Sequence, residues 1–140
     1  MKNKNINILF HTGNFDKIYY GLTTAAASLA VNINTKLFFT MEAIQSLTRN
    51  GAEYGWHKLT TVKAVNAVER NKILSNLGLP GFEEILNSCI VLNGIFMVCE
   101  SGLIVQEIKY SELRSDIKFS KGGLVTFFGE TQNDSSLIFI

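Results

Sequence analysis

Short apolar runs alternate along the chain with longer stretches whose apolar residues recur at helical spacing. The short runs predict strands, and they occupy residues 5–10, 35–40, 95–98, 117–119 and 135–140. The periodic stretches predict helices, and they occupy residues 16–31, 42–48, 82–93, 101–106 and 122–131. A weaker helical face covers 62–77, and a turn or short helix is expected at 110–114. This alternation is typical of an α/β protein whose parallel sheet is covered on both faces.

The segment 49–61, RNGAEYGWHKLTT, interrupts the alternation. Its glycines and its aromatic and imidazole side chains follow no clean period, which predicts a loop. The chain shows no internal repeat, low-complexity tract or linker, so we expect one domain over residues 1–140.

The predicted topology brings several reactive side chains to one place. In open parallel sheets, ligands bind at the edge where the carboxyl ends of the strands meet. His11, the loop after Thr40, and Cys99 all follow predicted strands. We therefore expect a pocket at this edge, lined by His11, Thr12, Gly13, Met41, Trp56, His57, Glu100, Ser101 and Gly102.

Cys99 has two interpretations that its local sequence leaves open. A free cysteine at the end of an apolar strand is often a small buried side chain. A helix that begins near Ser101 would instead stabilise a thiolate, which is the nucleophilic form of the side chain. Glu100 acts against that second interpretation, because a neighbouring carboxylate disfavours another negative charge.

The other pocket residues also have structural alternatives. His11 could act as an acid or base beside a thiolate, or could simply form hydrogen bonds within the turn HTGN. His57, together with Tyr54 and Trp56, could form a lid over the site. The same aromatic side chains could equally be buried in a contact between subunits.

Composition and charge narrow the function classes. The chain has 140 residues, of which 46% are hydrophobic and 18% charged, and its formal net charge is +1. This composition is typical of a compact globular protein. The small net charge and the lack of a dense basic run do not predict binding to nucleic acid or to acidic membranes. The start, MKNKNINILF, contains no apolar stretch of signal-peptide length. No apolar segment is long enough to cross a bilayer, so the expected location is the cytoplasm.

Metal and cofactor signatures are absent from the sequence. The chain has two cysteines and two histidines, no CxxC pair, and no metal-site spacing among them. Cys89 lies among apolar residues of the helix predicted at 82–93, so we expect it to pack in the core and not to pair with Cys99. The glycine-containing turns match neither a P-loop nor a GxGxxG fingerprint, so no cofactor is expected.

Five segments together resemble the DsrE/DsrF family of small sulfur-handling proteins. They are INILFHTGN, LTTAAASLAV, TKLFFTMEA, FEEILNSCIVLNGIFMVCESG and KGGLVTFFGETQNDSSLIFI. The resemblance extends along essentially the whole chain. It implies a three-layer α/β/α fold with a five-stranded, mainly parallel sheet, flavodoxin-like in general architecture, and assembly into trimers or hexamers.

The resemblance also implies a chemistry for Cys99. In sulfur-relay members the matching cysteine accepts sulfane sulfur as a persulfide and passes it to a partner protein. Two features depart from the relay pattern: Glu100 stands where small apolar residues are familiar, and the segment 49–61 has no counterpart.

Two hypotheses follow from the sequence. The first is a cytoplasmic sulfur carrier or sulfurtransferase-like protein that uses a Cys99 persulfide and exchanges sulfur with donor and acceptor proteins. The second is a non-catalytic, oligomeric binding module that holds a small ligand or metal in the pocket at the carboxyl edge of the sheet.

Overall fold

The centre of the protein is a five-stranded sheet in which all neighbouring strands are parallel. The computed structural model describes residues 4–131 and 134–140. The strand order across the sheet is β6-β5-β2-β1-β7. The strands are β1 (Asn5–Phe10), β2 (Asn34–Phe39), β5 (Ile95–Cys99), β6 (Phe119–Gly122) and β7 (Ser135–Phe139).

Helices connect these strands as the periodicity predicts. The α-helices are α1 (Phe15–Ala30), α2 (Ala67–Asn76), α3 (Phe82–Val91), α4 (Glu100–Val105) and α5 (Leu124–Gly129). Short 3-10 helices are η1 (Met41–Leu47), η2 (Gly55–Lys58) and η3 (Tyr110–Glu112). The predicted α/β class with a parallel sheet is confirmed. None of the helices within residues 4–131 and 134–140 is long and apolar enough to span a membrane.

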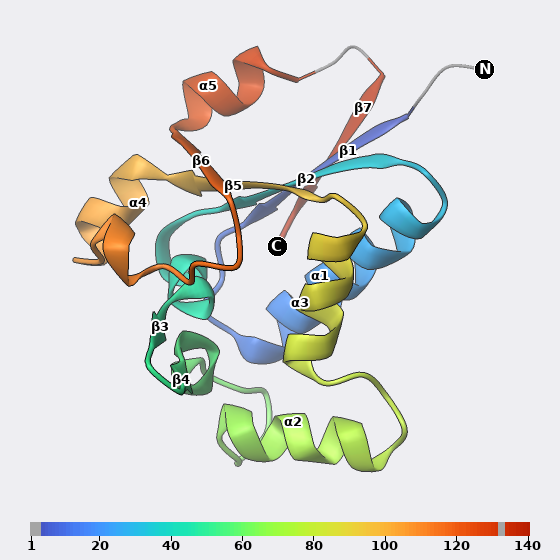
Figure 1. The fold of residues 1–140 in the computed structure, drawn as a ribbon, viewed down its shortest axis with the longest axis vertical. Helices are drawn as coiled ribbons and strands as arrows, with labels where there is room; N and C mark the ends of the chain where they lie inside the picture. Colours follow the sequence, from blue (N-terminus) through green and yellow to red (C-terminus); the bar gives the residue numbers. More distant parts are fainter. Residues whose placement is uncertain (1–3, 132–133) are drawn as a thin grey trace.

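The two faces of the sheet are covered unequally. Figure 1 shows α1 and α3 together on one side of the sheet and the short helix α5 on the other. Successive side chains of a strand point to opposite faces of the sheet. On β5, Phe96 and Val98 therefore point to the face covered by α1 and α3 and belong to the large core. The other two buried residues of β5, Met97 and Cys99, face the α5 side and belong to a small separate cluster.

Local sequence explains where the first helix begins. Asn14 has an extended backbone, and its side-chain oxygen accepts a hydrogen bond of 3.0 Å from the Lys17 N–H. This satisfies one of the backbone donors that a helix start leaves unpaired. Helix α2 is shorter than the predicted stretch 62–77, because Asn66 caps it in the same way and sets its first residue at Ala67.

The segment 49–61 is more ordered than a loop. It contains an antiparallel hairpin of β3 (Arg49–Asn50) and β4 (Glu53–Tyr54), followed by η2. Trp56 anchors it, since the indole stacks on Phe82 with ring centroids 4.9 Å apart and donates a 2.9 Å hydrogen bond to Glu83. The expectation of an irregular loop is therefore wrong, because an aromatic contact with a distant helix organises the segment.

A buried arginine completes this anchor. Arg114 donates 2.7 Å hydrogen bonds to both carboxylate oxygens of Glu83 and further ones to Asp116. Burial alone would lower the pKa of Arg114, but its hydrogen bonds to Asp116 and Glu83 raise it above the ordinary value. The bidentate geometry ties the chain before β6 to the start of α3.

Candidate functional site

Cys99 occupies the carboxyl end of β5, where the strand passes directly into α4. It is the last residue of the strand and the capping residue before Glu100, the first residue of the helix. Its neighbours across the sheet follow from the register, in which Cys99 pairs with Gly122 of β6 and Val98 pairs with Phe39 of β2. The structure thus places Cys99 at the sheet edge where the sequence predicted a site.

Cys99 belongs to a small apolar cluster on the α5 side of the sheet. Met97 comes from β5 itself, Phe38 from the adjacent strand β2, Leu9 from β1 beyond it, and Phe127 from α5. The rings of Phe38 and Phe127 stack with centroids 4.7 Å apart. Only 6% of Cys99 is exposed to solvent. Contact with the thiol therefore requires movement of at least one of these side chains.

A close approach of α4 to η1 shapes the other side of the cysteine. A Cβ placed on Gly102 would lie 2.8 Å from the Met41 backbone nitrogen and 2.7 Å from Ile44 Cδ1. It would also lie 3.5 Å from Cys99 Cβ, so these residues are brought together. Met41 has a φ of 46°, a left-handed conformation that is rare for a residue with a side chain. Glycine at position 102 is what permits this packing.

Glu100 and Ser101 lie beside Cys99 in sequence, but both are exposed. Their side chains belong to the first turn of α4 and are not part of the apolar cluster that contains Cys99. The Glu100 carboxylate therefore stands in water, where its repulsion of a second negative charge is weaker than in a buried site.

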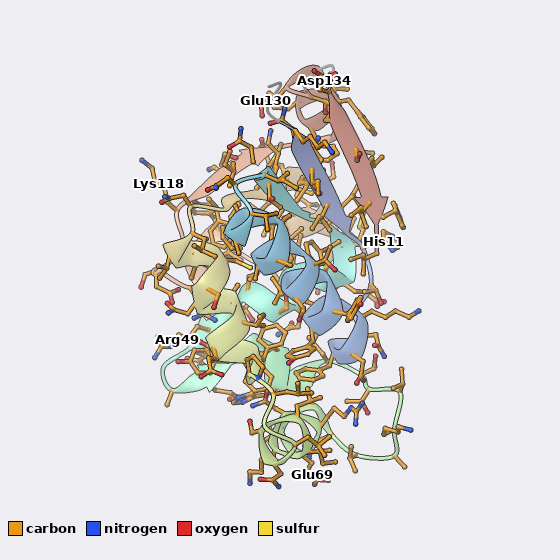
Figure 2. The ribbon with its side chains drawn as sticks, turned by 90° about the vertical axis from the view of Figure 1, so that its right-hand side faces the viewer. His11, Arg49, Glu69, Lys118, Glu130 and Asp134 are labelled. Atoms are coloured by element: carbon orange, nitrogen blue, oxygen red, sulfur yellow. The ribbon has the colours of Figure 1, made fainter. Side chains whose placement is uncertain are left out.

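The HTGN turn lies at the same edge of the sheet but does not contact the thiol. Extending the register from Phe10 and Phe39 places His11 two strands from Cys99, about 10 Å between Cα atoms. The imidazole packs instead on Phe139 of β7, with ring centroids 5.8 Å apart. Figure 2 shows His11 at the end of the β7 arrow, exposed at the surface.

The rest of the turn faces η1. A Cβ on Gly13 would lie 2.6 Å from Glu42 Oε2, so glycine allows this carboxylate to lie against the turn. The Thr12 hydroxyl accepts a 3.1 Å hydrogen bond from the Asn14 N–H and stabilises the turn itself. Thr12 therefore stabilises the turn through its hydroxyl, and Gly13 lets Glu42 approach because it has no side chain.

Trp56 and His57 lie elsewhere. Trp56 is buried among Phe15 and Phe82 in the large core, on the face of the sheet opposite to Cys99. The His57 ring meets the indole edge-on, with centroids 4.3 Å apart. The structure therefore does not gather these two residues with the cysteine, and the aromatic segment forms no lid over it.

The second cysteine is separated from the first by the sheet. Cys89 is fully buried in α3, within the core beneath α1, and its thiol donates to the Leu22 carbonyl at 3.4 Å. Burial raises the pKa of the Cys89 thiol to about 12. Both cysteines are free. The prediction that Cys89 packs in the core is confirmed.

The described residues contain no cluster of side chains that could bind a metal ion. Within residues 4–131 and 134–140, no group of three or more His, Cys, Asp or Glu side chains is placed to hold one.

Sequence reasoning missed Phe127 and Glu42. Both lie on elements that follow strands, which is a signal that could have pointed to the sheet edge. Neither could be assigned to Cys99 or to the HTGN turn without knowing how α5 and η1 pack.

A polar cavity of about 440 Å³ lies beyond η1, away from the thiol. It is formed by the hairpin, η1, η2 and the region around η3. Its lining side chains include Gln45, Arg49, Glu53, Lys58 and Glu112. Cys99 and His11 are not among the residues that line it.

Comparison with known proteins supports the fold. The structure is similar to a crystal structure of the YchN protein from E. coli, with a TM-score of 0.64 and 16% sequence identity. The match covers 99% of this chain and 100% of that chain. No protein-family model and no curated protein matches the sequence. YchN has a DsrE/DsrF-like fold, so the three-layer arrangement implied by the resemblance is the arrangement found here.

Proposed function

We propose that this protein is a sulfur carrier of the DsrE/DsrF type that holds sulfane sulfur as a persulfide on Cys99. The observation that carries the proposal is the position of Cys99, at the carboxyl end of β5 and at the start of α4. This is the sheet edge at which proteins of this architecture bind their ligands. The DsrE/DsrF-like fold, shared with YchN, supports the same assignment.

The transfer needs one sulfur nucleophile and no redox partner. The Cys99 thiol loses its proton, and the thiolate attacks the outer sulfur of a donor persulfide. A sulfur–sulfur bond to Cys99 forms, the donor's sulfur–sulfur bond breaks, and the donor leaves as a thiolate. An acceptor thiolate then attacks the outer sulfur of the Cys99 persulfide and restores the Cys99 thiolate. Each step exchanges one sulfur–sulfur bond for another, so there is no net oxidation or reduction.

The surroundings of Cys99 suit storage of a reactive sulfur. Leu9, Phe38, Met97 and Phe127 exclude water from the thiol, and a persulfide in such a site is protected from competing thiols. Donor and acceptor proteins, assembly into a trimer or hexamer, and a cytoplasmic location belong to the same proposal.

Mass spectrometry tests the proposal directly. After incubation with a sulfane donor such as polysulfide, we expect one added sulfur on the peptide that contains Cys99 and none on the peptide that contains Cys89. Cys89 is the internal control, because its thiol is fully buried and its pKa is raised to about 12. Cys99→Ser should remove the added sulfur. Donor treatment that leaves Cys99 unmodified in the folded protein would refute the proposal.

A binding module is the second candidate function, and the polar cavity beyond η1 favours it. Its volume of about 440 Å³ falls within the range of small-molecule sites. Lys58 and Glu53 make no ion pair with any residue of the described chain, so their charges are available to a polar ligand. A small molecule that copurifies with the wild-type protein and is lost from Lys58→Ala would support this function.

A further inference from the structure

Helix α5 closes the apolar cluster that contains Cys99 with a single buried side chain. Phe127 is the only residue of α5 that is buried. It packs on Phe38, and the cluster that it closes contains the sheet residues Leu9, Met97 and Cys99. No other helical residue of the described chain belongs to this cluster. The opposite face of the sheet, in contrast, is closed by two long helices.

The rest of α5 is weakly attached. The helix runs only from Leu124 to Gly129, and no side chain caps its first turn. Its other large apolar side chains point to solvent, with Val125 89% exposed and Phe128 53% exposed. A helix of this length does not persist without tertiary contacts. Its position therefore depends on the few groups that hold it against the sheet.

One ion pair, together with Phe127, holds α5 against the sheet. The Lys36 ammonium group on β2 lies 2.7 Å from a carboxylate oxygen of Glu130, the residue that ends α5. The same ammonium lies 6.0 Å from the centre of the Phe127 ring. Figure 2 shows Glu130 beside Asp134, near the amino ends of the strands, and His11 at the opposite, carboxyl end of β7. Because Glu130 is half exposed, salt weakens this contact.

We infer that α5 is a movable cover over the apolar cluster that contains Cys99, held closed by Phe127 and by the Lys36–Glu130 ion pair. This inference rests on the proposed function and adds to it the way in which a buried thiol becomes accessible. Displacement of α5 exposes Cys99 without unfolding the large core, because that core lies on the other face of the sheet. Closure returns the thiol, or its persulfide, to the apolar site.

Alkylation of the native protein by iodoacetamide tests the cover without requiring sulfur chemistry. The reaction rate at Cys99 is followed by peptide mass spectrometry, and Cys89 reports any global unfolding because it lies in the opposite core. We expect Phe127→Ala to raise the Cys99 rate by about tenfold or more, since it removes a whole buried aromatic ring. Val125→Ala is the matched control on the same helix, and it should leave the rate unchanged.

A second variant keeps the test independent of Phe127. Glu130→Gln removes the ion pair and retains the side-chain size, so we expect a smaller rise of about twofold to fourfold. High salt should produce a similar rise in the wild type but no further rise in Glu130→Gln. The mass of each variant is checked by light scattering, so that a change of assembly is not mistaken for movement of α5.

Several results would overturn the inference. Equal Cys99 rates in the wild type, Phe127→Ala and Glu130→Gln would show that α5 does not control access. Simultaneous reaction of Cys99 and Cys89 in the wild type would show that exposure follows global unfolding.

The cover and the sulfur chemistry can fail separately. Faster alkylation in Phe127→Ala without any sulfur gain from polysulfide would leave the cover standing and refute the proposed function. Sulfur gain at equal rates in the wild type and Phe127→Ala would support the proposed function and refute the cover.

Discussion

At the scale of single residues, the two cysteines differ in what covers them. Cys89 is enclosed by the large core, and a hydrogen bond to the Leu22 carbonyl satisfies its thiol. Cys99 is nearly as buried, but it lies at the carboxyl end of β5 in the small cluster that the short helix α5 closes. A difference in chemical role can therefore arise from what covers a thiol as well as from how exposed it is.

The Arg114 network predicts how stability responds to acid. The Arg114 hydrogen bond holds the pKa of Asp116 below its ordinary value of 3.8, with the Arg114 charge adding to the effect and burial acting against it. A carboxyl group whose pKa is lowered by folding stabilises the folded state above its unfolded pKa. That stability is lost as the pH falls through the folded pKa.

Asp116→Asn should therefore flatten the acid side of the stability profile. We expect the free energy of unfolding of the wild type to fall more than that of the variant between about pH 6 and about pH 2.5. The effect should be small, because the Asp116 side chain is about half exposed and solvent screens it. Urea unfolding at both pH values measures the difference. Identical changes in the wild type and the variant would show that this carboxylate does not contribute.

At the scale of elements, close backbone contacts position the irregular segments between β2 and α2. Gly55 begins η2, and a Cβ at this position would collide with the Thr48 hydroxyl and the Gln45 carbonyl oxygen. The absence of a side chain lets the hairpin pack directly against η1. Trp56 then enters the core beside Phe82.

Gly55→Ala should consequently be destabilising. Because the collision involves a backbone oxygen, which cannot rotate away, we expect a loss of about 1–3 kcal/mol in the free energy of unfolding. Gly129→Ala is the matched control, since a Cβ there meets nothing within 4 Å. Urea denaturation curves for both variants measure the effect. Equal midpoints for Gly55→Ala and the wild type would contradict this account of the hairpin.

At the scale of the whole molecule, the α5 side of the sheet carries exposed apolar side chains. Phe139 on β7 is 66% exposed and Leu137 is 51% exposed, and both face the same side as Leu9. The exposed residues of α5 lie on this side as well. Apolar surfaces of this kind are typical of contacts between proteins.

Assembly through this side is a prediction that light scattering can check. We expect a mass of three or six times the 15.6 kDa chain at micromolar concentration, as the family resemblance implies. Phe139→Asp should lower that mass, because a charge on a buried apolar contact is costly. Val31→Asp is the matched control, since Val31 is 67% exposed at the end of α1. A monomeric wild type, or equal effects of the two variants, would contradict assembly through the α5 side.

The sequence by itself determined the order of strands and helices, the parallel character of the sheet and the edge at which Cys99 lies. These features depend on local periodicity and on the geometry of parallel strands. The burial of Cys89 could be predicted because the apolar pattern of its own helix marks the face that packs into the core. The polar strand β6 was placed less well, at residues 117–119, since its register comes from pairing with β5.

Only the tertiary structure decided which side chains meet at the site. Phe127 closes the cluster over Cys99, Glu42 lies against the HTGN turn, and Trp56 enters the opposite core. Such contacts join residues from separate elements, and they depend on the face of the sheet to which each connecting segment packs. The sequence pattern specifies that a segment has an apolar face. The packing of the remaining elements determines what that face covers.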